Sequence, residues 1–317
     1  MVAGVFSWIV APWAAAGIAA RAAGVDLVSI LGASPRESLL WAYVFGVMWG
    51  VGGLTFGLSM RYLGMSLGYA LALGYCAAFG TVIPPIFQGR FHDLLGGLSG
   101  RVTLGGVVLC LAGIAFCGRA GVMKERELSN EAKQAAIREF SFVKGIWVAA
   151  LAGVMSACMA FAIAAGEPIG RLALSRGFDP LWQNTPVFIV ILAGGFTTNA
   201  LWCLFLNARN GTGADYLGCR PRRLLTNYIL SATAGTTWYM QFMFYGMGKT
   251  QMGRFDFSSW SIHMAFIIVF SNVWGLALAE WRGVSRRTLR TIEAGILVPV
   301  FSTFVIGAGS YLQSRGW

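Results

Sequence analysis

The sequence predicts an all-α integral membrane protein with nine transmembrane helices. Hydrophobic residues make up 56% of the 317 residues and charged residues only 12%, which is too little charge for the surface of a soluble fold. Apolar stretches of about 20 residues recur along the chain, the length that a helix needs to cross ~30 Å of hydrocarbon. Because backbone polar groups in lipid must be paired internally, these stretches are expected to form helices.

The nine predicted spans follow one another with short polar connections. We place them at 2–20, 39–58, 63–87, 102–118, 145–166, 185–206, 225–247, 259–279 and 291–312. The first span lacks the basic segment of a signal peptide, so we interpret it as a retained helix. The longest connection contains a charged segment, 124–140, that predicts a short surface helix.

Lysine and arginine residues gather in alternate connections. Most of the 24 basic residues lie in the second, fourth, sixth and eighth connections. Basic residues in short loops mark the cytoplasmic side of a bacterial inner-membrane protein, which predicts a cytoplasmic N-terminus and a periplasmic C-terminus. The net charge of +11 follows from loops that can contact anionic lipid headgroups, and it requires no nucleic-acid partner.

The basic connection 119–144 divides the chain into two halves. The N-terminal half, 1–118, has four predicted spans, and the C-terminal half, 145–317, has five. Many transporters consist of two repeats of inverted topology, and two five-helix repeats are inverted because five is odd. The pattern predicts an incomplete ten-helix bundle without the first helix of its first half. A mis-assigned start or a true truncation would each produce such a chain.

Four glycines in the second span predict a close helix contact. They follow one another at i, i+4, i+7 and i+11, and are Gly46, Gly50, Gly53 and Gly57. Small residues on one helix face allow another helix to approach closely. We therefore expect this whole face to pack against a second helix.

Polar and aromatic side chains near the middle of the membrane are candidates for a ligand site. They are Trp49 in the second span, Asn199 in the sixth, and Tyr239 and Gln241 in the seventh. Aromatic rings can stack on the apolar face of a sugar, and polar groups can bond its hydroxyls, so these residues predict a substrate-binding cavity between the two halves. Interhelical packing with polar groups paired across helices is the alternative, and the sequence leaves both open.

Ionisable residues within the predicted spans are few. An imidazole, with an ordinary pKa of ~6.5, suits the uptake and release of a proton, and His263 lies in the eighth span. Asp256, just before that span, is its candidate partner, and Glu167 is a reserve candidate. A structural role of His263 at the membrane interface is the alternative. The cysteines show no metal-ligand spacing and no enzyme motif is present, so we expect no catalytic residue, cofactor or metal.

Several short motifs are specific enough to indicate a family. They are 45–50 with 57–66, 119–121 with 124–126, 238–242, 259–260 with 263–264, and 280–281. On these motifs, over nearly its whole length, the chain resembles the bacterial L-rhamnose–proton symporters of the drug/metabolite transporter superfamily. The resemblance implies ten helices in two inverted five-helix repeats, and uptake of L-rhamnose with protons across the inner membrane. Members of that family begin with a further helix and a lysine-rich loop, which this sequence lacks.

The sequence fits two classes of function. One is a secondary transporter, for L-rhamnose or another small metabolite, since a fold does not fix a substrate. The other is a membrane protein that does not transport, such as a sensor or a truncated remnant. An additional apolar span encoded upstream of Met1 would favour the transporter.

Overall fold

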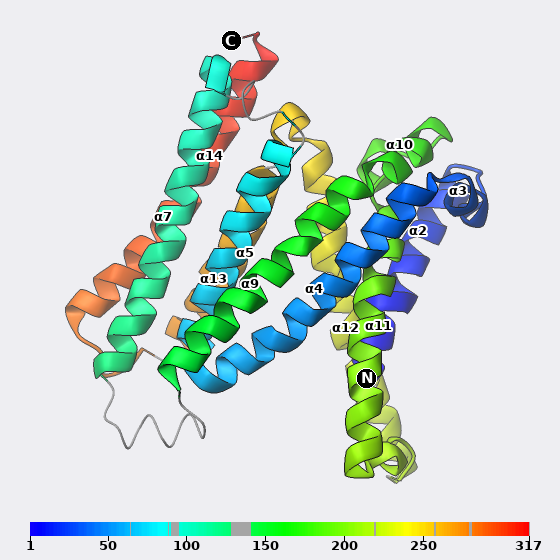
Figure 1. Cartoon of the computed structure of the whole chain (residues 1–317), viewed down its shortest axis with the longest axis horizontal. Helices are drawn as coiled ribbons and strands as arrows, with labels where there is room; N and C mark the ends of the chain where they lie inside the picture. The colour runs from blue at the N-terminus through cyan, green and yellow to red at the C-terminus, as the bar shows by residue number, and fades with distance from the viewer. Residues whose placement is uncertain are drawn as a thin grey trace. The chain divides into compact units, whose positions relative to one another are not determined.

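The computed structural model describes residues 1–63, 65–87, 89, 95–127, 141–218, 220–256, 258–278 and 281–316. Every regular element within these ranges is helical (Figure 1), which confirms the all-α prediction. Seven helices among the described residues are long and apolar enough to cross a membrane. Most of the expected surface helix at 124–140, from residue 128 on, lies outside the described residues, and so does Glu280 of the 280–281 motif.

Each predicted span corresponds to a helix. The first span comprises α1 (Val2–Val5), η1 (Phe6–Val10) and α2 (Ala11–Ala22). The other eight are α4 (Arg36–Leu63), α5 (Met65–Phe87), α7 (Leu98–Glu127), α9 (Phe142–Ala165), α11 (Thr185–Asn210), α12 (Pro221–Thr250), α13 (Ser258–Ala277) and α14 (Arg286–Ser314). Among these, α5 and α12 are not in the set of seven, although α5 contains the apolar stretch Leu71–Pro84.

The chain forms two compact units. Unit 1 comprises 1–51 and 161–251, and unit 2 comprises 52–160 and 252–317. Each unit contains segments from both predicted sequence halves, and α4 and α9 contribute residues to both units. The halves 1–118 and 145–317 therefore stay a prediction about sequence repeats.

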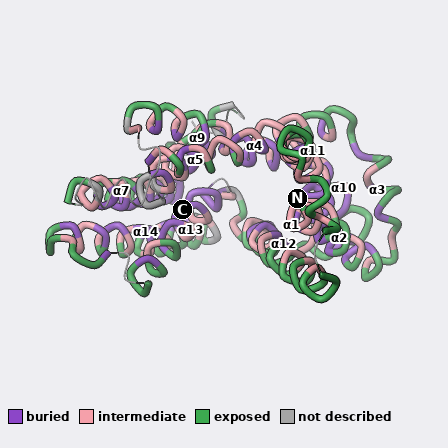
Figure 2. Tube along the Cα trace, turned by 90° about the horizontal axis from the view of Figure 1, so that it is seen from below, coloured by how far each residue is buried: buried purple, intermediate pink, exposed green. Residues whose placement is uncertain are grey.

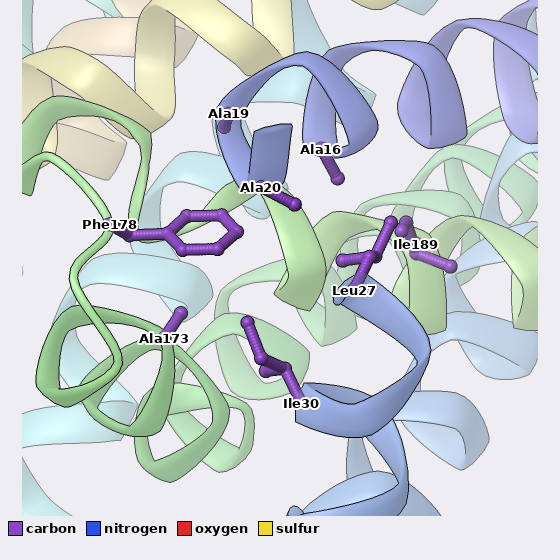
Figure 3. Packing of buried hydrophobic residues seen from close by; sticks show 8 residues of the cluster. All are labelled: Ala16, Ala19, Ala20, Leu27, Ile30, Ala173, Phe178 and Ile189. Atoms are coloured by element: carbon purple, nitrogen blue, oxygen red, sulfur yellow. The ribbon is translucent and has the colours of Figure 1, made fainter. Parts of the chain in front are cut away.

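Short helices at one end of unit 1 enclose a small apolar core (Figure 3). Asp26 caps α3 (Leu27–Ala33), where its carboxylate accepts the backbone N–H of Ser29 at 2.9 Å. The ring of Phe178 lies between Ala20 of α2 and Ala173 of α10 (Glu167–Ser175). The remaining core residues are Ala16, Ala19, Leu27, Ile30 and Ile189. The sequence analysis did not predict α3 or α10, which are too short to span a membrane.

In unit 2, α7 and α14 pack along most of their length. Buried stretches lie along both helices (Figure 2). The buried residues recur at alternating steps of four and three, the spacing of a coiled-coil seam. They are Ser99, Thr103, Gly106, Cys110, Gly113, Cys117 and Ala120 on α7, and Thr288, Ile292, Gly295, Pro299, Ser302, Ile306 and Gly309 on α14. Glycines make the contact close: a Cβ on Gly113 would collide with the ring of Pro299, and one on Gly106 would lie 2.6 Å from Ile306.

Large apolar side chains remain exposed on the outer faces of the helices. Trp147 on α9 is 73% exposed and Phe304 on α14 is 70% exposed. Many further large apolar side chains are exposed, which is unusual for a soluble monomer. These faces fit a lipid environment, as expected for a membrane protein.

Candidate functional site

Three tryptophan rings stack on one another in unit 1. The centroid of Trp8 lies 5.1 Å from that of Trp49 and 5.7 Å from that of Trp238, and the last two are 6.0 Å apart. Phe242 meets Trp49 and Trp238 edge-on, at 5.7 and 5.1 Å. The cluster joins side chains from η1, α4 and α12, and we call these four residues the indole cluster.

Helix α11 passes directly beside the indole cluster because it carries a glycine there. A Cβ on Gly195 would lie 2.8 Å from ring carbons of both Trp8 and Trp49. One turn later, the Asn199 amide donates to the backbone carbonyls of Gly195 at 3.0 Å and Gly50 at 3.3 Å. Asn199 thus joins α11 to α4 at the residue next to Trp49.

The glycine face of α4 packs as predicted over only part of its length. A Cβ on Gly46 would collide with the backbone of Ile191 in α11, and one on Gly50 would lie 2.9 Å from the carbonyl of Gly195. Gly53 and Gly57, by contrast, are exposed, with no atom within 4 Å of an added Cβ. The prediction was wrong for those two glycines: within unit 2 it is Gly52 of α4 that meets α9, where an added Cβ would lie 2.6 Å from the backbone nitrogen of Ser156.

Tyr239 and Gln241 follow Trp238 on α12, one and three residues later. Tyr239 is 2% exposed, and among the described residues its hydroxyl has no hydrogen-bond partner. It shares a helix face with Gly235 and Phe242, both of which are buried. Gln241 donates its amide N–H to the carbonyl of Trp238 at 3.0 Å. Trp49 thus belongs to the indole cluster, and the other three predicted residues lie on helices that adjoin it. That the four line one substrate cavity stays a prediction.

Trp8 was missed by the sequence analysis. It lies in η1, a turn of π-helix in which the N–H of Ala11 reaches the carbonyl of Phe6. Pro12 follows directly, and a proline has no N–H to donate to the carbonyl four residues earlier, which here belongs to Trp8. This proline inside an apolar span was the available signal, since π-turns often occur at functional sites.

The candidate proton-coupling residues lie in unit 2. The ring of His263 on α13 lies 5.9 Å from the ring of Trp260. Trp260 is buried, and its indole N–H donates to the carbonyl of Cys76 at 3.2 Å. Asp256 ends the short turn η4 (Gly253–Phe255), where its carbonyl accepts the hydroxyl of Ser259 at 2.5 Å. The partnership of His263 with Asp256 stays a prediction.

The reserve candidate for proton coupling, Glu167, is the first residue of α10. Its carboxylate pairs with Arg171 at 3.3 Å, and both side chains are partly exposed. An exposed pair one helical turn apart contributes little to stability.

A separate cavity of about 790 Å³ lies at another place in unit 1. It is lined by Met1, Val2, Val5, Leu204, Asn207, Ala208, Gly211, Gly213, Ala214 and Tyr216. Asn207 donates to the hydroxyl of Tyr216 at 3.0 Å, which helps to hold the turn η3 (Thr212–Tyr216) in place. The lining does not include the four residues predicted from the sequence.

The described residues contain no group of three or more His, Cys, Asp or Glu side chains that would hold a metal ion. Around the indole cluster, the chemistry consists of ring faces, two amides and one phenol. Such a mixture suits a small, uncharged, partly apolar ligand with hydroxyl groups.

Comparison with known proteins gives a consistent result over almost the whole chain. Residues 1–311 match the family described as L-rhamnose-proton symport protein (RhaT). The chain is 36% identical over 312 residues to an L-rhamnose-proton symporter of Cronobacter sakazakii, which covers 97% of this chain and 88% of that protein. Proteins of the same name from Salmonella dublin and Salmonella enteritidis are 35% identical over the same shares.

Proposed function

Because the chain belongs to the L-rhamnose–proton symporter family, and is thus a membrane transporter rather than an enzyme, we propose that it takes up L-rhamnose together with protons. The observation that carries the proposal is the indole cluster with its polar neighbours in unit 1. A deoxysugar presents both an apolar face and hydroxyl groups. The tryptophan rings would stack on the apolar face. The amides of Asn199 and Gln241 and the phenol of Tyr239 would form hydrogen bonds with the hydroxyl groups.

The proposal includes the membrane topology. We propose that α5 and α12 cross the membrane in addition to the seven apolar helices. Nine spans divided four and five around the basic segment 119–144 would fit a fold of inverted five-helix repeats. The basic residues of the even connections would then face the cytoplasm of a bacterial inner membrane.

The substrate site proposed for this function consists of Trp49, Asn199, Tyr239 and Gln241. His263, with Asp256 as its partner, is proposed for proton coupling. A neutral sugar carries no charge of its own, so proton-driven uptake requires a group that changes its protonation during the cycle.

The test is uptake of labelled L-rhamnose in a bacterial strain that lacks its own rhamnose transporter, with and without a proton gradient. We expect accumulation above the external concentration, and loss of that accumulation when an uncoupler removes the gradient. Equal uptake with the gradient removed would contradict proton coupling. No uptake of rhamnose, together with uptake of another labelled sugar, would show that the family function has a different substrate here.

A further inference from the structure

The indole of Trp8 stacks on both other indoles of the cluster, although the proposed site does not include it. Its ring centroid lies 5.1 Å from that of Trp49, the shortest separation between two of the three tryptophans, and 5.7 Å from that of Trp238. The interplanar angles of 29° and 23° are those of stacked rings. Trp8 therefore presents a ring face to each of the other two indoles.

Two glycines hold the backbone near Trp8 close to its neighbours. Gly195 on α11 leaves the space that the Trp8 and Trp49 rings occupy. Gly235 on α12 faces the segment before Trp8, where an added Cβ would collide with the carbonyl of Ala3 and lie 3.0 Å from Phe6. The π-turn then sets the direction of Trp8 within this confined space.

A polar group lies on the same helix face as that contact. Tyr239 is one helical turn after Gly235, and its hydroxyl is buried with no hydrogen-bond partner in the described part of the chain. A buried hydroxyl in a native protein normally has a partner, either protein, water or ligand. The confined ring faces and this hydroxyl together make a site with both apolar and polar parts.

We propose that Trp8 is a substrate-binding residue, whose indole stacks on the apolar face of a neutral sugar. The rings now contact one another, so a bound sugar must replace one of these ring contacts. Displacing Trp8 would leave the contacts of Trp49 and Trp238 with each other and with Phe242 in place. Trp49 also adjoins the bonds from Asn199 and Thr198 to α4, so Trp8 is the ring that we expect to give way. This inference deepens the proposed function and rests on its sugar substrate.

Trp8→Phe and Trp8→Leu separate stacking from simple packing. Both replacements are apolar and smaller than tryptophan, but only phenylalanine keeps a ring face. Trp13→Leu is the matched control, because Trp13 lies on the same span and is 41% exposed. The measurement is the affinity of each purified full-length variant for L-rhamnose, obtained from the rise in melting temperature with sugar concentration. The melting temperature without sugar reports the fold of each variant.

We expect Trp8→Leu to weaken binding on the order of tenfold or more, with Trp8→Phe between it and the wild type, as for loss of an aromatic contact. Trp13→Leu is expected to bind as the wild type does. If the melting temperature of Trp8→Leu is too low for the assay, the affinity of Trp8→Phe for L-rhamnose is compared with that of the wild type, and a weaker affinity supports the inference. Wild-type affinity in the Trp8 variants would overturn this inference and leave the proposed function intact.

A panel of other neutral sugars distinguishes failure of the proposed substrate, L-rhamnose, from failure of the proposed role of Trp8. If L-rhamnose does not stabilise the wild type but another sugar does, the proposed substrate fails. The Trp8 variants are then scored with that sugar, and loss of its binding supports the inference. If no sugar of the panel stabilises the wild type, both the inference and the sugar substrate are overturned.

Discussion

Gln241 is a polar residue beside the indole cluster, and its substitution tests the proposed sugar contact. Its N–H bonds the carbonyl of Trp238 within the same helix, and an amide also carries an oxygen that accepts hydrogen bonds. We expect Gln241→Leu to weaken L-rhamnose binding a few-fold to about tenfold, because a hydrogen bond contributes ~0.5–1.5 kcal/mol. The measurement is the KM for uptake. Gln251→Leu, at the end of the same helix, is the control and should keep the wild-type KM.

Single residues show where reasoning from the sequence succeeded and where it could not. Trp49 and Asn199 were chosen for depth and residue type, and the structure places Asn199 against the residue next to Trp49. Trp8 was not predicted as a site residue, because a regular helix was assumed for the first span. The π-turn before Pro12 shifts the helical phase, and a pattern of apolar residues alone does not record that shift.

At the scale of elements, helix positions followed from apolar length, whereas helix partners did not. The spacing of Gly46, Gly50, Gly53 and Gly57 correctly indicated a smooth face on α4. It could not show that Gly46 and Gly50 meet α11, whereas an added Cβ on Gly53 or Gly57 has no atom within 4 Å. The seam of α7 and α14 obeys a clear seven-residue repeat, but its partner helices are far apart in sequence.

Gly50→Leu tests the contact of α4 with α11. A leucine side chain has no space there, since even a Cβ would lie 2.9 Å from the carbonyl of Gly195. We expect a loss of about 1–3 kcal/mol in the free energy of unfolding from overpacking. Gly53→Leu is the control, because that position is open. Equal melting temperatures for the two variants would contradict the contact.

A carboxylate of α7 closes the first turn of α14. Glu127 accepts the hydroxyl of Thr288 at 2.6 Å, the hydroxyl of Ser285 at 2.7 Å and the backbone N–H of Ser285 at 2.6 Å. The bonds from Thr288 and then Ser285 hold the pKa of Glu127 below its ordinary value. A carboxylate at a helix N-terminus also meets the positive end of the helix dipole.

The pH dependence of stability tests this contact. Because the pKa of Glu127 is lowered by folding, its contribution is complete above the ordinary carboxyl pKa and disappears as the pH falls through the lowered value. We expect Glu127→Gln to lower the melting temperature at neutral pH and to reduce the further loss on acidification. Glu293→Gln, an exposed glutamate on α14, is the control. A wild-type pH profile in Glu127→Gln would show that the contact does not form in the membrane.

For the whole molecule, the proposed orientation follows from the distribution of basic residues rather than from the fold. The same helices would pack equally well with the chain inverted in the bilayer, so only the loop charges choose between the two directions. We expect a C-terminal fusion to alkaline phosphatase to be active and a C-terminal fusion to green fluorescent protein to be dark. The reverse pair of results would place the C-terminus in the cytoplasm.

Proton coupling is the property that depends on the whole transport cycle. A symporter accumulates sugar only if protonation and sugar binding are coupled in the same states, so removing the titrating group should uncouple them. We expect His263→Gln to abolish accumulation driven by a proton gradient, while exchange of labelled for unlabelled L-rhamnose continues. Asp256→Asn should shift the pH profile of accumulation if Asp256 holds the protonated imidazole.

The other histidine of the chain supplies the control for this experiment. His92→Gln removes an imidazole from a predicted outer connection, and it should accumulate sugar as the wild type does. Loss of exchange as well as accumulation in His263→Gln would indicate a general defect in the fold beside Trp260, rather than uncoupling. Wild-type accumulation with an unchanged pH profile in His263→Gln would remove His263 from the mechanism. The coupling group would then have to be sought among the other carboxylates, beginning with the reserve candidate Glu167.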